Sequence, residues 1–359
     1  GKDRWKKDLM KPLIEVNGLR IAFGDAVPVR DVSFTVPEHG RVAIVGESGS
    51  GKSVTVKTAV GILDTNGKVV SGKAMFTFKN DSGEEETIDL LTLSKKQMRR
   101  TINGKRIAMV FQDPMTSLNP TMTIGAQIME GMIWHYHTPK AEAKKRAIEL
   151  LEMVGITDAE KRFKSYPHQL SGGMRQRVVI AIALSCNPDL LICDEPTTAL
   201  DVTIQAKILE LIKEVQDKLG ISVIYITHDL GVVAKVADFV NIMYAGKIVE
   251  KGTVDEIYYD PRHPYTWGLL SALPDLDTDD ERLYAIPGSP PNLLHEVKGD
   301  AFAPRNEFAL NIDSIAEPPL FKVTDTHYAA TWLLDDNAPK VDMPKELRAR
   351  IDRMLKEAK

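Results

Sequence analysis

The sequence predicts an α/β fold, in which short buried strands bring polar residues to a common edge of a sheet. The first observation is an apolar run at residues 42–45, which a glycine-rich turn and a helix start follow directly. The second is a set of short apolar runs at 107–111, 190–193 and 221–227, each followed by polar residues. Such runs are typical of buried parallel strands, whose carboxyl ends carry the ligand-binding groups of open α/β sheets.

Composition limits the classes of protein to which the chain can belong. Its 359 residues, 43% of them hydrophobic, can bury a large core. A net charge of -4 counts against nucleic acid as the main partner. Cys186 and Cys193 lie in apolar runs and are expected to be buried thiols in a reducing compartment. Residues 1–11 lack a signal-peptide pattern and no long apolar run occurs, so we expect neither export nor a membrane span.

The amino-terminal part is expected to contain a β-layer. Residues 13–16 and 32–36 alternate apolar and polar side chains and predict two antiparallel strands. Between them, Phe23 and Gly24 are predicted to lie in a loop, where the Phe23 ring could stack on a base; the alternative is an ordinary packed phenylalanine. Residues 67–91 alternate again around a turn at 80–83 and predict that the layer continues.

The glycine-rich turn predicts a loop that binds a polyphosphate. It reads Gly46-Glu47-Ser48-Gly49-Ser50-Gly51-Lys52-Ser53. Its glycines let successive N–H groups point inward, and the helix that follows directs its positive dipole end to the same place. Lys52 would supply charge for the terminal phosphates, and the Ser53 hydroxyl would bind Mg²⁺. A chance match is the alternative, which the flanking strand and helix disfavour.

Polar residues at the ends of the other buried strands are candidates for the same site. Gln112 follows one strand and is a candidate metal or water ligand, and His228 follows another. Asp194 and Glu195 follow a third strand. Because successive side chains on a strand point in opposite directions, we expect one carboxylate to face a metal and the other a water.

A helical subdomain is predicted at about residues 116–186. Within residues 141–154 the apolar side chains fall at 143, 147, 148, 150, 151 and 154, which is a helical spacing. Leu170-Ser171-Gly172-Gly173 precedes another apolar helix and is a second potential anion cradle, a weak signal by itself.

The carboxyl-terminal part changes in character. Residues 238–252 predict a hairpin that turns at Ala245-Gly246. Frequent prolines beyond Tyr258 predict a domain boundary there, with a small irregular extension at 259–336. The charged tail, 337–359, places Leu347, Ile351 and Leu355 four residues apart and predicts at most a peripheral helix.

Taken in order, these motifs resemble the nucleotide-binding domain of ABC transporters over about residues 13–255, with Ala199-Leu200-Asp201 as a further match. The resemblance implies that residues 1–258 form a P-loop NTPase domain with a RecA-like core, an antiparallel β subdomain and an inserted helical subdomain. In that family two domains pair head to tail, and each ATP lies between the phosphate loop of one and the LSGG segment of the other.

The resemblance also implies a role for each matching residue. The residues expected to bind ATP are Phe23, Gly46, Glu47, Ser48, Gly49, Ser50, Gly51, Lys52, Ser53, Ser171, Gly172, Gly173 and Asp201, the last four at the dimer contact. Those expected to hold Mg²⁺ are Ser53, Gln112 and, through water, Asp194. Those expected to act in hydrolysis are Lys52, Gln112, Glu195 as general base and His228 as contact to the γ-phosphate.

Residues 263–274 and 286–291 resemble the carboxyl extension of oligopeptide and dipeptide importer ATPases. Many relatives carry four cysteines there that bind an iron–sulfur cluster. The matching positions are here Asp300, Asn306, Asp313 and Thr331, so we expect no Fe–S cluster. The extension is expected to serve as a packing or interface element, anchored by Phe302, Phe321 and Trp332.

The resemblance therefore implies an ATP-hydrolysing subunit of a peptide importer, peripheral on the cytoplasmic face of the cell membrane. Its expected partners are a second ATPase subunit that is a distinct homologue, two transmembrane permease subunits docked near residues 112–119 and, indirectly, an extracytoplasmic peptide-binding protein; no nucleic acid is expected. The alternatives are a soluble ABC ATPase of DNA repair or translation and an importer of nickel or another small solute. The short, cysteine-free segment 112–171 disfavours the first alternative.

Overall fold

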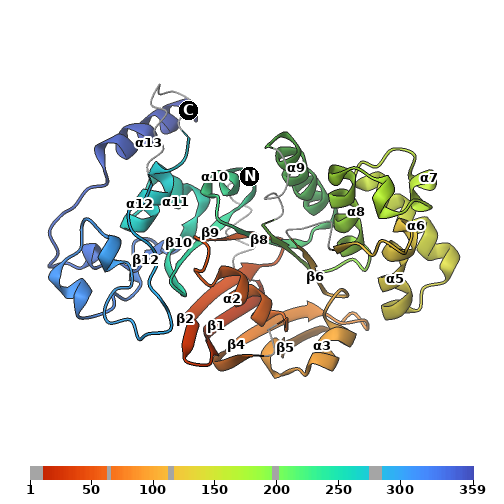
Figure 1. Cartoon of the computed structure of the whole chain (residues 1–359), viewed down its shortest axis with the longest axis horizontal. Helices are drawn as coiled ribbons and strands as arrows, with labels where there is room; N and C mark the ends of the chain where they lie inside the picture. Colours follow the sequence, from red (N-terminus) through yellow and green to blue (C-terminus); the bar gives the residue numbers. More distant parts are fainter. Residues whose placement is uncertain (1–10, 63–65, 112–116, 196–201, 275–284) are drawn as a thin grey trace.

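A mixed sheet of eight strands lies at the centre of the computed structural model (Figure 1). The structure describes residues 11–62, 66–111, 117–195, 202–274 and 285–359; at 202–205 it describes the backbone alone. Its strand order is β11-β12-β10-β9-β3-β8-β7-β6. The parallel strands are β3 (Arg41–Val45), β6 (Ile107–Val110), β7 (Leu190–Asp194), β8 (Ser222–Thr227) and β9 (Phe239–Tyr244). The predicted α/β fold is confirmed.

The antiparallel edge of this sheet joins the core to the extension. β9 and β10 (Lys247–Thr253) form the predicted hairpin, and its turn uses the left-handed conformation at Ala245 and Gly246. β12 (Tyr328–Ala329) pairs with β10, and β11 (Phe321–Lys322) pairs with β12. The main sheet thus continues past residue 258, and the boundary placed there stays a prediction.

Strand alternation divides the hydrophobic core between the two faces of the sheet. Along β3, Ala43 and Val45 belong to one buried cluster, whereas Val42 and Ile44 belong to the other. The first cluster continues into the helices on that face, and the second continues into a separate antiparallel sheet. Because both faces are covered, the strands are nearly all apolar, as the sequence indicated.

The separate sheet has the order β2-β1-β4-β5, and Figure 1 shows it packed below α2. Its strands are β1 (Pro12–Phe23), β2 (Ala26–Pro37), β4 (Gly67–Lys79) and β5 (Glu85–Asp89). The loop predicted at Phe23 and Gly24 is confirmed for Gly24 but wrong for Phe23, which is the last residue of β1; β1 and β2 run to a tight turn at residues 24–25. The strand was missed because its register shifts after Val16, where Gly18 adopts a φ of 59°, which breaks the alternation of side chains.

The helical subdomain lies beyond β6, at the far right of Figure 1. It comprises α5 (Ile124–Tyr136), α6 (Lys140–Met153), α7 (Ala159–Phe163) and α8 (Gly172–Leu184). The remaining helices are α2 (Lys52–Ala59), α3 (Lys95–Thr101), α9 (Val202–Leu219), α10 (Leu230–Val236), α11 (Val254–Tyr259), α12 (Pro264–Ser271) and α13 (Lys345–Glu357). Within the described ranges, none of the helices combines the length and the hydropathy that a bilayer crossing requires.

The charged tail forms α13, which packs on α11 and α12. Leu347 and Ile351 are buried, whereas Leu355 is 38% exposed. Arg350 donates from Nη1 to the carbonyl oxygens of Leu270 and Leu273, at 3.1 and 2.8 Å. The tail helix therefore binds the carbonyl groups at the end of α12, where a cation is favoured.

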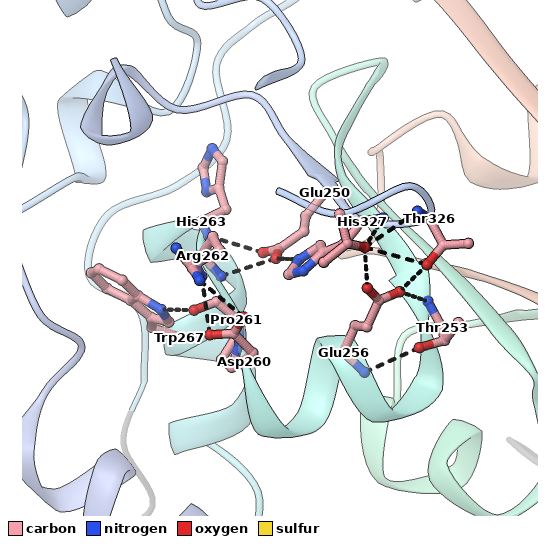
Figure 2. Close-up of polar contacts among 11 residues, drawn as sticks. Glu250, Thr253, Glu256, Asp260, Pro261, Arg262, His263, Trp267, Thr326 and His327 are labelled. Carbon is pink, nitrogen blue, oxygen red and sulfur yellow. Dashed lines mark hydrogen bonds and ion pairs between the residues drawn. The ribbon is translucent and has the colours of Figure 1, made fainter. Parts of the chain in front are cut away.

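A buried carboxylate fastens the extension to the main sheet (Figure 2). Glu250, on β10, is fully buried and accepts hydrogen bonds from the backbone N–H groups of Arg262 and His263, both at 2.9 Å. His327 Nε2 donates a third bond at 2.6 Å from the returning segment of the extension. These donors offset the cost of burying the charge, and they tie three segments to one side chain.

Glu256, on α11, makes a second attachment next to the first (Figure 2). It accepts from the Thr253 N–H at 2.9 Å and the Thr326 hydroxyl at 2.6 Å, and it also bonds the Thr324 hydroxyl. The turn that carries His327 is thereby held against the start of α11.

Replacing the buried carboxylate tests this attachment. Glu250→Ala leaves two backbone N–H groups and His327 without an acceptor, and should lower the free energy of unfolding by about 3 kcal/mol, as for other buried charge networks. Urea denaturation of the purified chain measures the loss. Glu307→Ala, which removes an exposed glutamate of the same extension, should stay within about 0.5 kcal/mol of the parent. An equal effect of the two changes would contradict the assigned attachment.

Candidate functional site

The glycine-rich turn forms a tight loop between β3 and α2. Gly51 has a φ of 89°, and a Cβ atom there would lie 2.4 Å from the Pro28 carbonyl oxygen. A Cβ atom on Gly46 would lie 2.5 Å from the Met243 carbonyl oxygen. Only glycine fits at either position, because a side chain would force the surrounding backbone apart.

The inside of the loop presents donors without acceptors. The Ser50 hydroxyl is buried and, among the described residues, has no hydrogen-bond partner. The N-terminus of α2, which begins at Lys52, has no side-chain cap and no acidic residue in its first turn. An uncapped helix N-terminus beside a buried hydroxyl group suits an anionic ligand such as a phosphate group.

Glu195 contacts both Lys52 and His228 beside the loop. Lys52 Nζ lies 3.5 Å from Glu195 Oε1 and 3.4 Å from the Glu47 carbonyl oxygen. His228 Nδ1 lies 3.2 Å from the same Glu195 oxygen, and its side chain is 56% exposed. The ends of β7 and β8 and the start of α2 therefore bring an ammonium, a carboxylate and an imidazole together.

Asp194 contacts a different set of groups from its neighbour. The Ser53 hydroxyl donates to Asp194 Oδ1 at 3.2 Å, and Lys57 Nζ lies 3.5 Å from Oδ2. Glu195 has a φ of 46°, a left-handed conformation that turns the chain at the end of β7. A hydroxyl and a carboxylate that converge in this way are hard oxygen donors, which fit Mg²⁺.

Other predicted site residues are less completely placed. Gln112 and Asp201 lie outside the described residues. Phe23 is half-buried and packs against the second core cluster at the end of β1, which agrees with the packed alternative and leaves its stacking role a prediction.

Lys57 was not singled out from the sequence. One helical turn after the glycine-rich loop, a lysine on a helix usually lies in solvent, so no local signal marked it.

Ser171, Gly172 and Gly173 lie at the start of α8, and in Figure 1 this helix is well separated from α2. Ser171 caps the helix, because its hydroxyl accepts from the Met174 N–H at 3.3 Å. A Cβ atom on Gly172 would meet nothing within 4 Å. This segment therefore offers an open helix N-terminus that lies apart from the loop of its own chain.

The four positions of the extension that would match cluster ligands carry oxygen-bearing side chains. Asp300, Asp313 and Thr331 are buried, and burial, together with the Asp313 carboxyl, raises the pKa of Asp300 to about 7. The Thr331 hydroxyl accepts from the Leu333 N–H at 3.3 Å. These side chains do not fit an Fe–S cluster, which requires thiolates, and the absence of a cluster stays a prediction.

The three aromatic residues predicted to anchor the extension differ in how deeply their side chains are buried. Phe302 is buried, with its ring centroid 5.2 Å from that of Tyr244 and 5.5 Å from that of Tyr265. Phe321 and Trp332 pack on each other at 5.8 Å and are partly exposed. Phe302 therefore connects the extension to the core, whereas the other two rings stabilise the extension itself.

Two family matches cover most of this architecture. Residues 29–198 match the family described as "ABC transporter". Residues 249–312 match the family described as "Oligopeptide/dipeptide transporter, C-terminal region".

Relatives of known name match along almost the whole chain. The chain is 55% identical to the oligopeptide transport ATP-binding protein OppD of Bacillus subtilis (strain 168), over 95% of this chain and 94% of that protein. It is 53% identical to the dipeptide transport ATP-binding protein DppD of Lactococcus lactis subsp. cremoris (strain MG1363), over 94% and 95% of the two chains.

Solved structures match the part that contains the loop. A dimeric, post-hydrolysis structure of the ATP-binding cassette MJ0796 bound to ADP and Pi has a TM-score of 0.56 and 27% identity, and covers 67% of this chain and 98% of that one. CbiO1 of Clostridium perfringens, part of the transporter complex CbiONQ, has a TM-score of 0.59 and 29% identity, covering 70% and 92%.

Proposed function

The chain belongs to the ATP-binding proteins of oligopeptide and dipeptide ABC transporters, and from this membership we propose that it hydrolyses ATP to drive peptide uptake through membrane permease subunits. The observation that carries the proposal is identity above 50% along nearly the full chain, with the extension included in the match. The family match over 249–312 favours peptide transport over a DNA-repair or translation ATPase.

Binding of the triphosphate would rest on the loop and on Lys52. The loop supplies N–H groups and the Ser50 hydroxyl, which has no partner in the part of the chain that the structure describes, and Lys52 supplies a mobile positive charge. Lys52 Nζ is 3.5 Å from Glu195, so the phosphates and this carboxylate would share the same ammonium. Phe23 at the end of β1 remains the proposed contact to the adenine base.

Ser53 and Asp194, with Gln112, would hold Mg²⁺, which supplies charge neutralisation for the β- and γ-phosphates when it is bound. Glu195 would orient and deprotonate the attacking water, and His228, in contact with Glu195, would bind the γ-phosphate. Lys52 and these groups would stabilise the transferring phosphoryl group mainly by position and charge.

The second anion cradle, at Ser171–Gly173, would require a second subunit to complete each ATP site. The open N-terminus of α8 would contact ATP held by the loop of another subunit, with Asp201 at the seam between the two. The cassette MJ0796 is dimeric in its solved structure, which supports this arrangement. We propose a distinct homologous ATPase as the other subunit.

The proposed location is the cytoplasmic face of the cell membrane, where the chain would be peripheral and bound to two permease subunits. Their docking site would lie near residues 112–119, of which only 117–119 are described. ATP would perform work by stabilising the closed pair of subunits, a differential affinity that the permease senses. An extracytoplasmic protein would deliver the peptide.

The role of Glu195 is tested by an isosteric change. Glu195→Gln keeps the shape of the side chain but cannot accept a proton from water, so ATP turnover should fall at least about 100-fold, the scale of a lost general base. Phosphate release measures turnover, and titration with MgATP should still show binding. Unchanged turnover would end the assignment of Glu195.

The composite site is tested at Gly172, where the isolated chain has room for a side chain. Gly172→Asp places a negative charge against the partner's ATP and should reduce turnover of the complex, purified through this chain, at least about tenfold. Ala141→Asp is the matched control, because it adds the same single negative charge at the exposed second position of α6. If both variants hydrolyse ATP at the parent rate, α8 does not face a nucleotide.

The transported solute is tested in cells. When the Glu195→Gln chain replaces the parent, uptake of a radiolabelled oligopeptide should be lost, because closure of the ATPase pair no longer leads to hydrolysis, while uptake of ⁶³Ni²⁺ should continue. The reverse pattern, loss of nickel uptake with peptide uptake intact, would refute the peptide assignment.

A further inference from the structure

Arg305, which lies in the extension, reaches the phosphate loop. Its Nη1 donates to Glu47 Oε2 at 2.8 Å, and its Nη2 donates to Glu47 Oε1 at 3.1 Å. Glu47 is the second residue of the glycine-rich loop, so the ion pair joins two positions 258 residues apart in the sequence. Two parallel bonds of this kind fix both the distance and the orientation of the carboxylate.

The arginine is itself held firmly. Its side chain is only 4% exposed, and its Nε donates to the Pro287 carbonyl oxygen at 2.9 Å. Its Nη2 also lies 3.3 Å from the Ile286 carbonyl oxygen, and its guanidinium lies 5.7 Å from the centre of the Tyr244 ring. Since each of its nitrogens donates to the protein, Arg305 has little freedom to follow a loop that moves.

A second group from the same region also binds Glu47. The buried Tyr265, on α12, accepts from the Glu47 N–H through its hydroxyl at 3.2 Å. Phe302, three residues before Arg305, packs against this tyrosine. The extension therefore contacts both the backbone and the carboxylate of one loop residue.

The position of Glu47 in turn affects Ser50 and Lys52, which are proposed to bind phosphate. Its carbonyl oxygen accepts from the Ser50 N–H at 3.1 Å and lies 3.4 Å from Lys52 Nζ. A carboxylate so close to a polyphosphate site would also repel the ligand if nothing neutralised it. Arg305 thus has two effects on the loop: it fixes the position of Glu47 and it cancels the charge of its side chain.

We propose that Arg305 is a positioning residue for nucleotide binding, so that the docking of the extension onto Glu47 sets the affinity of the phosphate loop for ATP. The inference rests on the proposed ATPase function and adds a link that runs from the extension to the loop. A change that displaces the extension weakens ATP binding without touching any group that contacts the phosphates.

The experiment titrates the purified full-length chain with a non-hydrolysable ATP analogue and Mg²⁺. Arg305→Met should raise the dissociation constant about tenfold, the scale of one lost charge-assisted bond. Arg305→Lys keeps the charge but cannot bond both oxygens, and should raise it about threefold. Arg262→Met is the matched control: this arginine of the extension bonds Asp260 through Nε and Nη2, each at 3.0 Å, and should bind as the parent does.

A double variant separates positioning from a general loss of structure. Glu47→Gln removes the charge that Arg305 cancels, so Glu47→Gln/Arg305→Met should bind the analogue more tightly than Arg305→Met alone. Thermal unfolding without nucleotide identifies any variant that fails to fold, and Arg305→Lys then takes the place of Arg305→Met in the same comparison.

Two outcomes would overturn the role of Arg305, and a third would overturn the proposed ATPase function instead. Equal affinities of parent and Arg305 variants would overturn it, and so would a loss that Glu47→Gln does not relieve. If the parent chain itself does not bind the analogue, the proposed ATPase function fails, which the control distinguishes from a failure of Arg305 alone.

Discussion

The structure depends on one close approach of backbone to backbone around the phosphate loop. Gly51, on the loop, and Gly246, in the β9–β10 turn, both face the Pro28 carbonyl oxygen of β2, with room for no Cβ atom at either position. The Gly246 N–H donates to the Ser50 carbonyl oxygen at 2.8 Å. Two sheets and the loop therefore meet at a point that excludes side chains, and this contact fixes where the loop opens.

The parallel order of the strands then decides what surrounds the loop. β3 lies between β8 and β9, and β7 lies beyond β8, so the carboxyl ends of these strands reach the same edge of the sheet. Asp194, Glu195 and His228 come from two of these ends, and they approach the start of α2 from one side. On the other side, the extension contacts the loop through Arg305 and Tyr265. Buried contacts at Glu250 keep that extension in place.

Much of this was predictable from residue order, and each failure has a physical cause. The loop, the buried strands, the helical subdomain and the β9–β10 hairpin follow from periodicity and turn residues, which act over a few positions. β1 was misplaced near Phe23 because a register shift after Val16 breaks the alternation that identifies a strand. Lys57 was missed because its contact with Asp194 depends on a strand more than a hundred residues later in the sequence.

The sequence by itself determined the local machinery of this protein: a glycine-rich phosphate loop, acidic and histidine residues at strand ends, and a second glycine pair before a helix. These features depend on backbone freedom and hydrogen bonding between near neighbours, so they can be recognised without a structure. Only the tertiary structure decided which distant groups meet them, as with Arg305 on Glu47 and His327 on Glu250. Such pairs form because the fold buries these distant groups beside each other, where a buried charge needs a charged or hydrogen-bonding partner, and no spacing along the chain records that pairing.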